Sequence, residues 1–185
     1  IKTEWVYLAL ILIAAFLIRS YQLNLPGLYY DESGPINSCQ AFMEGTKPSE
    51  PALEIGGKYF LLSGSEYTGA TQFYIYCSVR HLIDNPLLHR CINIIFSLIA
   101  ITFSYLLAKE LLSKKAATAL ALILTFSPSF LFYSRVGMHV IFLRTVFATG
   151  IFYFFYKWYK SKNWLYFYLG SFWTGLGITT RLELA

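Results

Sequence analysis

The sequence predicts an all-α protein that crosses a membrane several times. Hydrophobic residues make up 56% of the chain and aromatic residues 19%, against 14% charged residues, and the mean hydropathy is positive. Apolar segments of near-spanning length recur along the chain, and short Lys-rich loops separate some of them. A soluble domain rarely combines so much apolar sequence with so little charge, so a bilayer is the expected solvent.

The first apolar segment, residues 5–18, is predicted to be a membrane span. A signal-peptide core has a similar length, but no small-residue cleavage site follows this segment, so we expect it to be retained. Aromatic and basic residues beside a short apolar segment lie at headgroup level and extend the effective span. On the same grounds four further spans are predicted, at 91–108, 116–133, 140–156 and 164–179.

The long stretch 19–90 is predicted to be a loop outside the bilayer that contains short helices. One helix is expected near 31–44, where Ser33 can act as N-cap and Gly45 can end the helix. The following residues, 45–66, are rich in Gly, Pro and Ser, a composition typical of a loop.

A second short helix is expected near 68–83. This segment is apolar enough to suggest a sixth span, but it contains Gln72, Arg80 and His81. Burying these side chains in lipid would cost several kcal/mol together. We therefore expect this helix to lie in the outer interface, beside the membrane.

The lysines predict the orientation of the chain. The short loops 109–115 and 157–163 carry three lysines each, which places both on the cytoplasmic side. Alternation of the spans then places 134–139 and 19–90 outside, and seven of the ten acidic residues lie in 19–90. The net charge of +5 is thus explained by topology, and a nucleic-acid partner is not implied. An integral protein of a cell membrane or an ER-type membrane is expected.

The three cysteines give little information. Cys39 and Cys77 would face an oxidising compartment and could pair, while Cys91 lies at the edge of a predicted span. Without a CxxC motif or a histidine at ligand spacing, neither a zinc site nor a disulfide framework is supported. Free, buried thiols are the expected state.

Two adjacent acids stand out in the segment LNLPGLYYDESG. Asp31 and Glu32 follow a Pro-Gly turn and two tyrosines, which brings them back toward the membrane surface. A solvated loop pair is the simpler interpretation. Aromatic surroundings, however, raise the pKa of a carboxylate and suit it to act as a general base. Asp31 is also a possible ligand of a divalent cation whose shell phosphate oxygens would complete.

Basic residues are expected at the same depth on the outer side. Arg135 ends the third span, either as an arginine reaching the interface or as a phosphate clamp. Arg144 lies about one turn into the next span, where an ionised group usually faces a cavity or a partner. His139 is a candidate proton carrier, metal ligand or interfacial imidazole, and we favour the last.

A succession of motifs carries a family resemblance. The first span is followed by Arg19, PGLYYDE, YTGATQFYIY beginning at Tyr67, Asn85-Pro86, Arg90 and SPSFLFYSRVG. In this order the chain resembles the amino-terminal half of a GT-C glycosyltransferase of the family 39 type, the protein O-mannosyltransferase and aminoarabinose transferase group. The resemblance implies more spans after the part seen here.

The resemblance implies an inverting transfer of a sugar from a polyprenyl-phosphate donor on the outer, periplasmic or luminal, face. The acceptor would be a protein, a lipid or a glycan. It places Asp31, with Glu32 beside it, in the active site. Arg90, Arg135, Arg144, Tyr67 and His139 become candidate substrate-binding residues.

One feature departs from the family pattern. Several relatives carry an acidic residue a few positions after the arginine of the second outer loop, where a metal binds, and this chain has His139 and Val140 there. The transfer is expected to need no cofactor, and a divalent metal is the alternative that the sequence leaves open. A non-catalytic polytopic subunit or a transporter is the alternative function, in which the acidic pair is structural.

Overall fold

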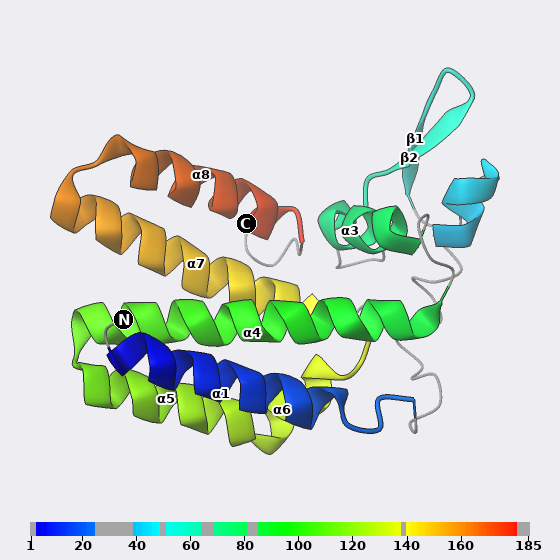
Figure 1. The fold of residues 1–185 in the computed structure, drawn as a ribbon. Coiled ribbons are helices and arrows are strands. Elements are labelled where there is room, and N and C mark those ends of the chain that lie inside the picture. The colour runs from blue at the N-terminus through cyan, green and yellow to red at the C-terminus, as the bar shows by residue number, and fades with distance from the viewer. Residues whose placement is uncertain are drawn as a thin grey trace.

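The structure is a computed structural model that describes residues 3–24, 39–48, 51–63, 69–80, 85–137 and 140–180. Long helices lie side by side in a bundle, and a smaller group of elements covers one end of it (Figure 1). The bundle contains α1 (Thr3–Ser20), α4 (Pro86–Leu111), α5 (Lys114–Phe126), α6 (Pro128–Ser134), α7 (Val140–Ser161) and α8 (Trp164–Ile178). The smaller group contains α3 (Ala70–Arg80), β1 (Ala52–Ile55) and β2 (Lys58–Leu61).

Side-chain caps fix the starts of three bundle helices. The side chain of Asn85 accepts a hydrogen bond from the backbone N–H of Leu87 at 2.9 Å, and Pro86 opens α4 without needing a partner for its nitrogen. Ser113 caps α5, and Asn163 caps α8 in the same way. These caps explain why neighbouring helices are separated by only a few residues.

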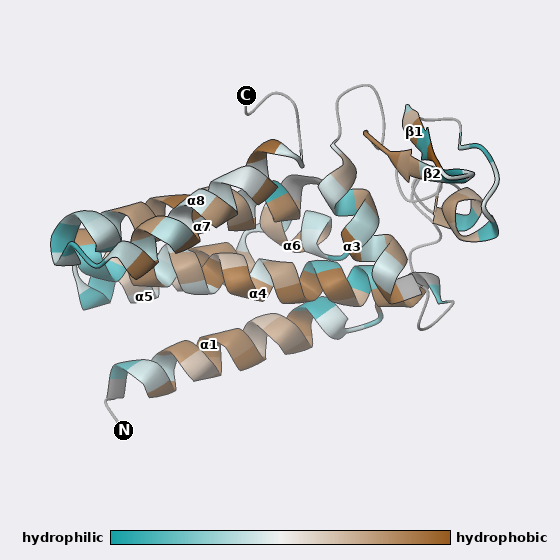
Figure 2. Cartoon of the chain, turned by 90° about the horizontal axis from the view of Figure 1, so that it is seen from above, coloured by the Kyte–Doolittle hydropathy of each residue, from teal (hydrophilic) through white to brown (hydrophobic). Residues whose placement is uncertain are grey.

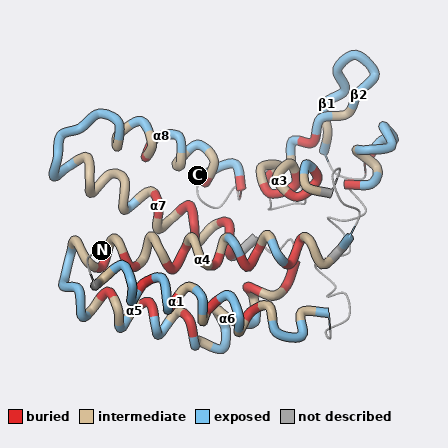
Figure 3. Tube along the Cα trace, in the orientation of Figure 1, coloured by how far each residue is buried: buried red, intermediate tan, exposed pale blue. Residues whose placement is uncertain are grey.

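The central helix is α4, which packs against α1 and α5 on one side and α7 on the other (Figure 1). A core of buried residues joins α1, α4 and α5, and its members include Leu8, Ala15, Ile101, Ala117 and Ala121. Figure 3 shows buried residues along α4 and α3, while much of α8 is exposed. Exposed large apolar side chains on α1 and α8, such as Leu10, Phe16, Tyr168 and Phe172, suit contact with lipid.

The two ends of the bundle differ in composition. Successive long helices run in opposite directions, so the α4–α5 and α7–α8 connections lie at one end (Figure 1). Hydrophilic residues gather at these connections in Figure 2. The opposite end carries α3, the β-strands and α6. This arrangement agrees with the alternation expected from the lysines.

The segment predicted as a span at 116–133 is not one continuous helix. The structure divides it into α5 and α6, which are bent by 61° relative to each other. Pro128 has no N–H and disfavours helical geometry in the residue before it, and Ser127 accordingly adopts φ −59° and ψ 122°. The proline therefore ends α5 and begins α6.

The other spans are found as helices, with α4 extended to 26 residues, about 39 Å at 1.5 Å per residue. By length and apolar composition, one helix of the described part, Leu87–Leu111, is able to cross a membrane, or two if the bent pair α5 and α6 forms one span. The α8 helix has 15 residues, fewer than the roughly 20 that a span needs. Five spans therefore stay a prediction.

The described part of the chain is mostly helical, as predicted, but a β-hairpin corrects the expectation for residues 45–66. Residues 45–66 were expected to form a loop, but β1 and β2 pair antiparallel from Ala52↔Leu61 to Ile55↔Lys58. Gly56 and Gly57 form the turn with φ of 60° and 74°, values that favour glycine in a two-residue hairpin. A Gly-Gly pair flanked by β-prone residues was the available signal.

The two short helices predicted in the long loop are found in part. Residues 39–44 are helical and end at Gly45, which has φ 67°. The rest of the predicted 31–44 helix, including Ser33, lies outside the described residues. The α3 helix confirms the helix expected near 68–83, and it runs across the direction of α4 (Figure 2).

We expect Gly150→Ala to destabilise the packing of α7 on α8. A Cβ at Gly150 would lie 2.2 Å from Nε1 of Trp173, which donates to the carbonyl of Val146 at 3.2 Å. Overpacking of this kind typically costs about 1–3 kcal/mol, so the melting temperature of the purified protein should fall. Gly175→Ala is the matched control, because nothing lies within 4 Å of its added Cβ. Equal melting temperatures for both variants would contradict this packing.

Candidate functional site

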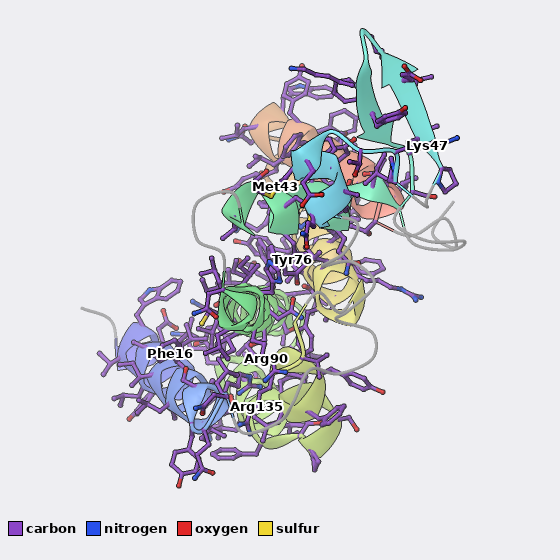
Figure 4. All side chains as sticks on the ribbon, turned by 90° about the vertical axis from the view of Figure 1, so that its right-hand side faces the viewer. Phe16, Met43, Lys47, Tyr76, Arg90 and Arg135 are labelled. Atoms are coloured by element: carbon purple, nitrogen blue, oxygen red, sulfur yellow. A yellow bond between two sulfur atoms is a disulfide. The ribbon has the colours of Figure 1, made fainter. Side chains whose placement is uncertain are left out.

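Two arginines converge on the turn that follows α1. Arg135 Nη2 donates to the carbonyls of Tyr21 and Gln22 at 2.7 and 3.1 Å, and Arg90 Nη1 donates to the carbonyl of Leu23 at 2.8 Å. Carbonyls just beyond a helix end lack intrahelical partners and carry partial negative charge, so cations stabilise them. Figure 4 looks onto this end of the bundle, where Arg90 and Arg135 lie close together.

Arg135 retains unused hydrogen-bonding capacity. It follows α6 as the C-cap, and its side chain is partly buried. A guanidinium has five N–H donors, and the Nε of Arg135 is buried with no hydrogen-bond partner in the described part of the chain. Buried donors are nearly always paired, whereas this Nε lacks an acceptor among the described residues.

Arg19 joins the end of α1 to the break between α5 and α6. It is fully buried, and its Nη2 donates to the carbonyl of Leu124 at 3.2 Å while Nη1 donates to those of Ala15 and Thr125. In an unbroken helix the Leu124 carbonyl would accept from residue 128, but Pro128 has no N–H. Arg19 replaces that missing donor, so its role in this structure is to support the fold.

A buried polar chain fixes the turn that carries Arg135. The Tyr76 hydroxyl on α3 donates to the Asn93 side chain on α4, and Asn93 Nδ2 donates to the carbonyl of Val136. Burial raises the pKa of the Tyr76 phenol far above its ordinary range, which keeps it a neutral donor. Because Val136 follows Arg135, this chain positions the arginine relative to α3 and α4.

Residues 69–71 bring the start of α3 against the end of α8. The N–H of Gly69 donates to the carbonyl of Thr180 at 2.9 Å, and the N–H of Thr71 donates to that of Thr179 at 3.3 Å. A Cβ at Gly69 would lie 1.9 Å from the Thr179 carbonyl oxygen, so glycine is required for this close backbone approach.

A disulfide corrects the expectation for two cysteines. Cys39 and Cys77 are bonded to each other, whereas Cys91 is free and exposed. The two bonded cysteines lie 38 positions apart in the sequence. The packing of residues 39–44 on α3 brings their Cα atoms to within 5.3 Å of each other. Phe42 also contacts the rings of Phe73 and Tyr74 edge to face.

The hairpin is attached to the same helix. The Tyr74 hydroxyl donates to the carbonyl of Leu61 at the end of β2 at 3.0 Å, and burial raises the pKa of this phenol. The side chain of Leu61 is itself buried against the disulfide region. Residues 39–44, the hairpin and α3 therefore form one unit at this end of the bundle.

Replacing Cys39 and Cys77 together by alanine is expected to lower stability by about 2–4 kcal/mol, since a cross-link restricts the unfolded chain. The measurement is the melting temperature of the purified protein without reductant. Cys91→Ser is the control, because this thiol is free and exposed. Three titratable thiols in the unreduced, denatured wild type would contradict the disulfide.

Comparison with known families gives a match to the later part of the chain. Residues 84–185, just over half of the chain, match the family described as dolichyl-phosphate-mannose-protein mannosyltransferase. The chain belongs to this mannosyltransferase family. A search of curated proteins and a search of solved structures gave no match.

Membership in the mannosyltransferase family confirms the resemblance to GT-C glycosyltransferases of the family 39 type. Proteins of this family are membrane-embedded and in general use lipid-linked sugar donors and protein acceptors. The family favours a transferase over the alternative of a transporter.

The mannosyltransferase match covers some of the site residues predicted from the sequence. It contains the three arginines and His139, and the structure brings Arg90 and Arg135 together. Arg144 lies in the second turn of α7 and is partly buried. The remaining predicted residues, Asp31, Glu32, Tyr67 and His139, lie outside the described residues, so their roles stay predictions.

Sequence reasoning missed Asn93. A carboxamide inside the predicted span 91–108 was the available signal, since a polar group at such a position usually has a buried partner. In the mannosyltransferase fold of this chain, Asn93 is fully buried and links α3 to the turn after α6. In the part of the chain that the structure describes, three or more His, Cys, Asp or Glu side chains do not gather at any point as a metal site would require.

Proposed function

We propose that this protein transfers a mannose-type sugar from a polyprenyl-phosphate donor to an acceptor hydroxyl on the outer face of the membrane, with inversion at the anomeric carbon. The observation that carries the proposal is the convergence of Arg90 and Arg135 on residues 21–23, which precede Asp31 and Glu32 by a few positions in the sequence. This convergence supports a single site for the donor phosphate and the catalytic carboxylates.

The arginines would act on the phosphate. As the bond from the anomeric carbon to the phosphate oxygen breaks, negative charge develops on the departing polyprenyl phosphate. The planar guanidinium of Arg135 is already oriented by two carbonyls, and its Nε, which has no partner among the described residues, would donate to a phosphate oxygen. Arg90 and Arg144 are the further candidates for stabilising this charge.

Asp31 would act on the acceptor. The hydroxyl oxygen of the acceptor attacks the anomeric carbon from the side opposite the phosphate, and its proton passes to the Asp31 carboxylate. Glu32 would support or orient its neighbour. This step balances in atoms and charge without a further reactant, and a divalent cation held by Asp31 would assist the phosphate rather than supply the base.

Features at both ends of the bundle support an outer location of the site. Disulfides persist in oxidising compartments, and the Cys39–Cys77 bond lies at the end that carries Arg90 and Arg135. Lysines gather at the opposite end, as on the cytoplasmic side of membrane proteins. A chain in this orientation would present its site to the periplasm or lumen.

Cysteine labelling tests this orientation. In a Cys91→Ser background, Ser113→Cys at the α4–α5 connection is expected to react with an impermeant maleimide only from the cytoplasmic side of sealed vesicles. Leu53→Cys on the exposed face of the hairpin is the matched control and should react only from the outer side. Labelling of Ser113→Cys from outside would overturn the orientation.

The activity itself is tested with the full-length protein in membranes. A panel of polyprenyl-phosphate sugars, including mannosyl, glucosyl and aminoarabinosyl donors, is offered with protein, lipid and glycan acceptors. We expect transfer from at least one donor, fastest with mannose, and the product should have inverted anomeric configuration. Transfer from soluble nucleotide sugars instead, or retention of configuration, would overturn the proposal.

A further inference from the structure

The Lys-rich end of the bundle contains a cavity that the proposed transfer does not use. Its volume is about 780 Å³, and it lies between α1, α4 and α5. Most of its lining residues lie in the first turns of α1 and near the start of α5, at the end of the bundle opposite α3 and α6 (Figure 1). The lining combines basic, hydroxyl and apolar side chains, among them Glu4, Tyr105, Lys114, Lys115, Thr118 and Leu122.

Positive charge dominates at this cavity. Glu4 accepts ion pairs from Lys109 at 3.2 Å and from Lys114 at 2.9 Å, so one carboxylate faces two lysines. Lys115 is exposed and makes no ion pair with any described residue. Lys109, Lys114 and Lys115 together with Glu4 give this end of the cavity a net charge of two positive units.

The start of α5 adds to this preference for an anion. Its first turn contains no acidic residue, and its backbone N–H groups point toward the same end of the bundle. One of these N–H groups, that of Ala116, donates a hydrogen bond to the side-chain oxygen of Ser113. Two lysines at a helix start repel the helix dipole, so an anion at this position would relieve an unfavourable arrangement.

Tyr105 supplies an independent indication of a ligand. Its side chain lines the cavity and is 1% exposed, and its hydroxyl has no hydrogen-bond partner in the described part of the chain. Buried hydroxyl groups are nearly always paired, because leaving one unpaired forfeits its hydration. The Tyr105 hydroxyl is therefore placed to bond with a group that occupies the cavity.

We propose that this cavity binds the headgroup phosphate of an anionic phospholipid, with Lys115 and the Tyr105 hydroxyl as ligands. The apolar wall distinguishes a lipid from a free anion. Tyr7 and Leu122 line the cavity, and Leu10 and Ile123 continue the exposed apolar surface along α1 and α5. An acyl chain fits this surface, and basic pockets between membrane helices are suited to anionic headgroups.

Lipid binding is measured by native mass spectrometry of the full-length protein in detergent, with phosphatidylglycerol, phosphatidylcholine and inorganic phosphate as separate probes. We expect the wild type to retain phosphatidylglycerol in preference to the other two. Lys115→Ala should weaken this binding about fivefold, the effect of one lysine near an anionic membrane surface. Lys160→Ala is the matched control, an exposed lysine of α7 at the same end.

Tyr105→Phe separates binding from folding. Because the hydroxyl has no partner in the described chain, the melting temperature without added lipid should not fall. The rise in melting temperature on adding phosphatidylglycerol should be smaller than in the wild type. Equal retention of phosphatidylglycerol and phosphatidylcholine, an equal effect of inorganic phosphate, or unchanged binding in both variants would overturn the proposal. None of these measurements depends on sugar transfer.

Discussion

Asp31→Asn is expected to lower the turnover of the full-length enzyme by a factor on the order of 100 or more, the usual contribution of a positioned base. The substitution keeps the shape of the side chain and removes its charge and its ability to take a proton. Turnover is measured at saturating donor and acceptor, and donor binding is measured separately, so that a loss of chemistry is distinguished from a loss of binding.

The structure gives this expectation a physical basis in the segment that precedes Asp31. The carbonyls of Tyr21, Gln22 and Leu23 are held by Arg135 and Arg90, so the chain enters the acidic segment from a fixed position beside two guanidinium groups. If the Asp31 carboxylate lies close to the two guanidinium groups, it shares one site with the phosphate of the donor. The same arginines would thus hold residues 21–23 in place and stabilise the leaving group.

Glu32→Gln is the comparison variant for Asp31→Asn. It should reduce turnover less, because Glu32 is proposed to support its neighbour rather than to take the proton. A larger loss in Glu32→Gln than in Asp31→Asn would exchange the two roles. Near-normal turnover in Asp31→Asn, with normal expression, would show that the acidic pair is a solvated loop feature.

Much of the helical architecture follows from the sequence alone. Apolar segments with basic and aromatic flanks predicted helices at the right places, and caps at Asn85, Ser113 and Asn163 set three of the starts. The break at Pro128 and the hairpin at Gly56 had local signals, namely a proline inside an apolar segment and a Gly-Gly pair. In the prediction, the length of the apolar segment 116–133 outweighed the proline, and the Gly-, Pro- and Ser-rich composition of 45–66 outweighed the Gly-Gly pair.

Contacts between distant segments explain what the sequence could not predict. The Cys39–Cys77 bond requires residues 39–44 to pack on α3, and no local pattern specifies that packing. The role of Arg19 likewise depends on two features together, the buried end of α1 and the carbonyl of Leu124 that Pro128 leaves unpaired. Pattern reasoning identifies charged residues at one end of a bundle, but only the packing shows which carbonyls they meet.

Arg135→Ala is expected to reduce turnover by about 10²- to 10³-fold, the range observed when one preorganised donor to a developing negative charge is removed. If Arg135 stabilises the departing phosphate, turnover should fall while the KM for the donor changes little. Arg135→Lys keeps one positive charge but loses the planar group and its Nε, so it should restore only part of the activity. Steady-state kinetics with varied donor concentration measure both effects.

The alternative is a purely structural role, because Arg135 also holds the carbonyls of Tyr21 and Gln22. Asn93→Ala tests that alternative, since it releases the carbonyl of Val136 in the same turn without removing any guanidinium. A structural role predicts that both variants lose melting temperature and turnover in proportion. A role at the phosphate predicts that Arg135→Ala loses far more turnover than Asn93→Ala at a similar melting temperature, and that added guanidinium ion restores part of the turnover of Arg135→Ala alone. Equal losses in the two variants, without rescue, would assign Arg135 to the support of the α1 turn.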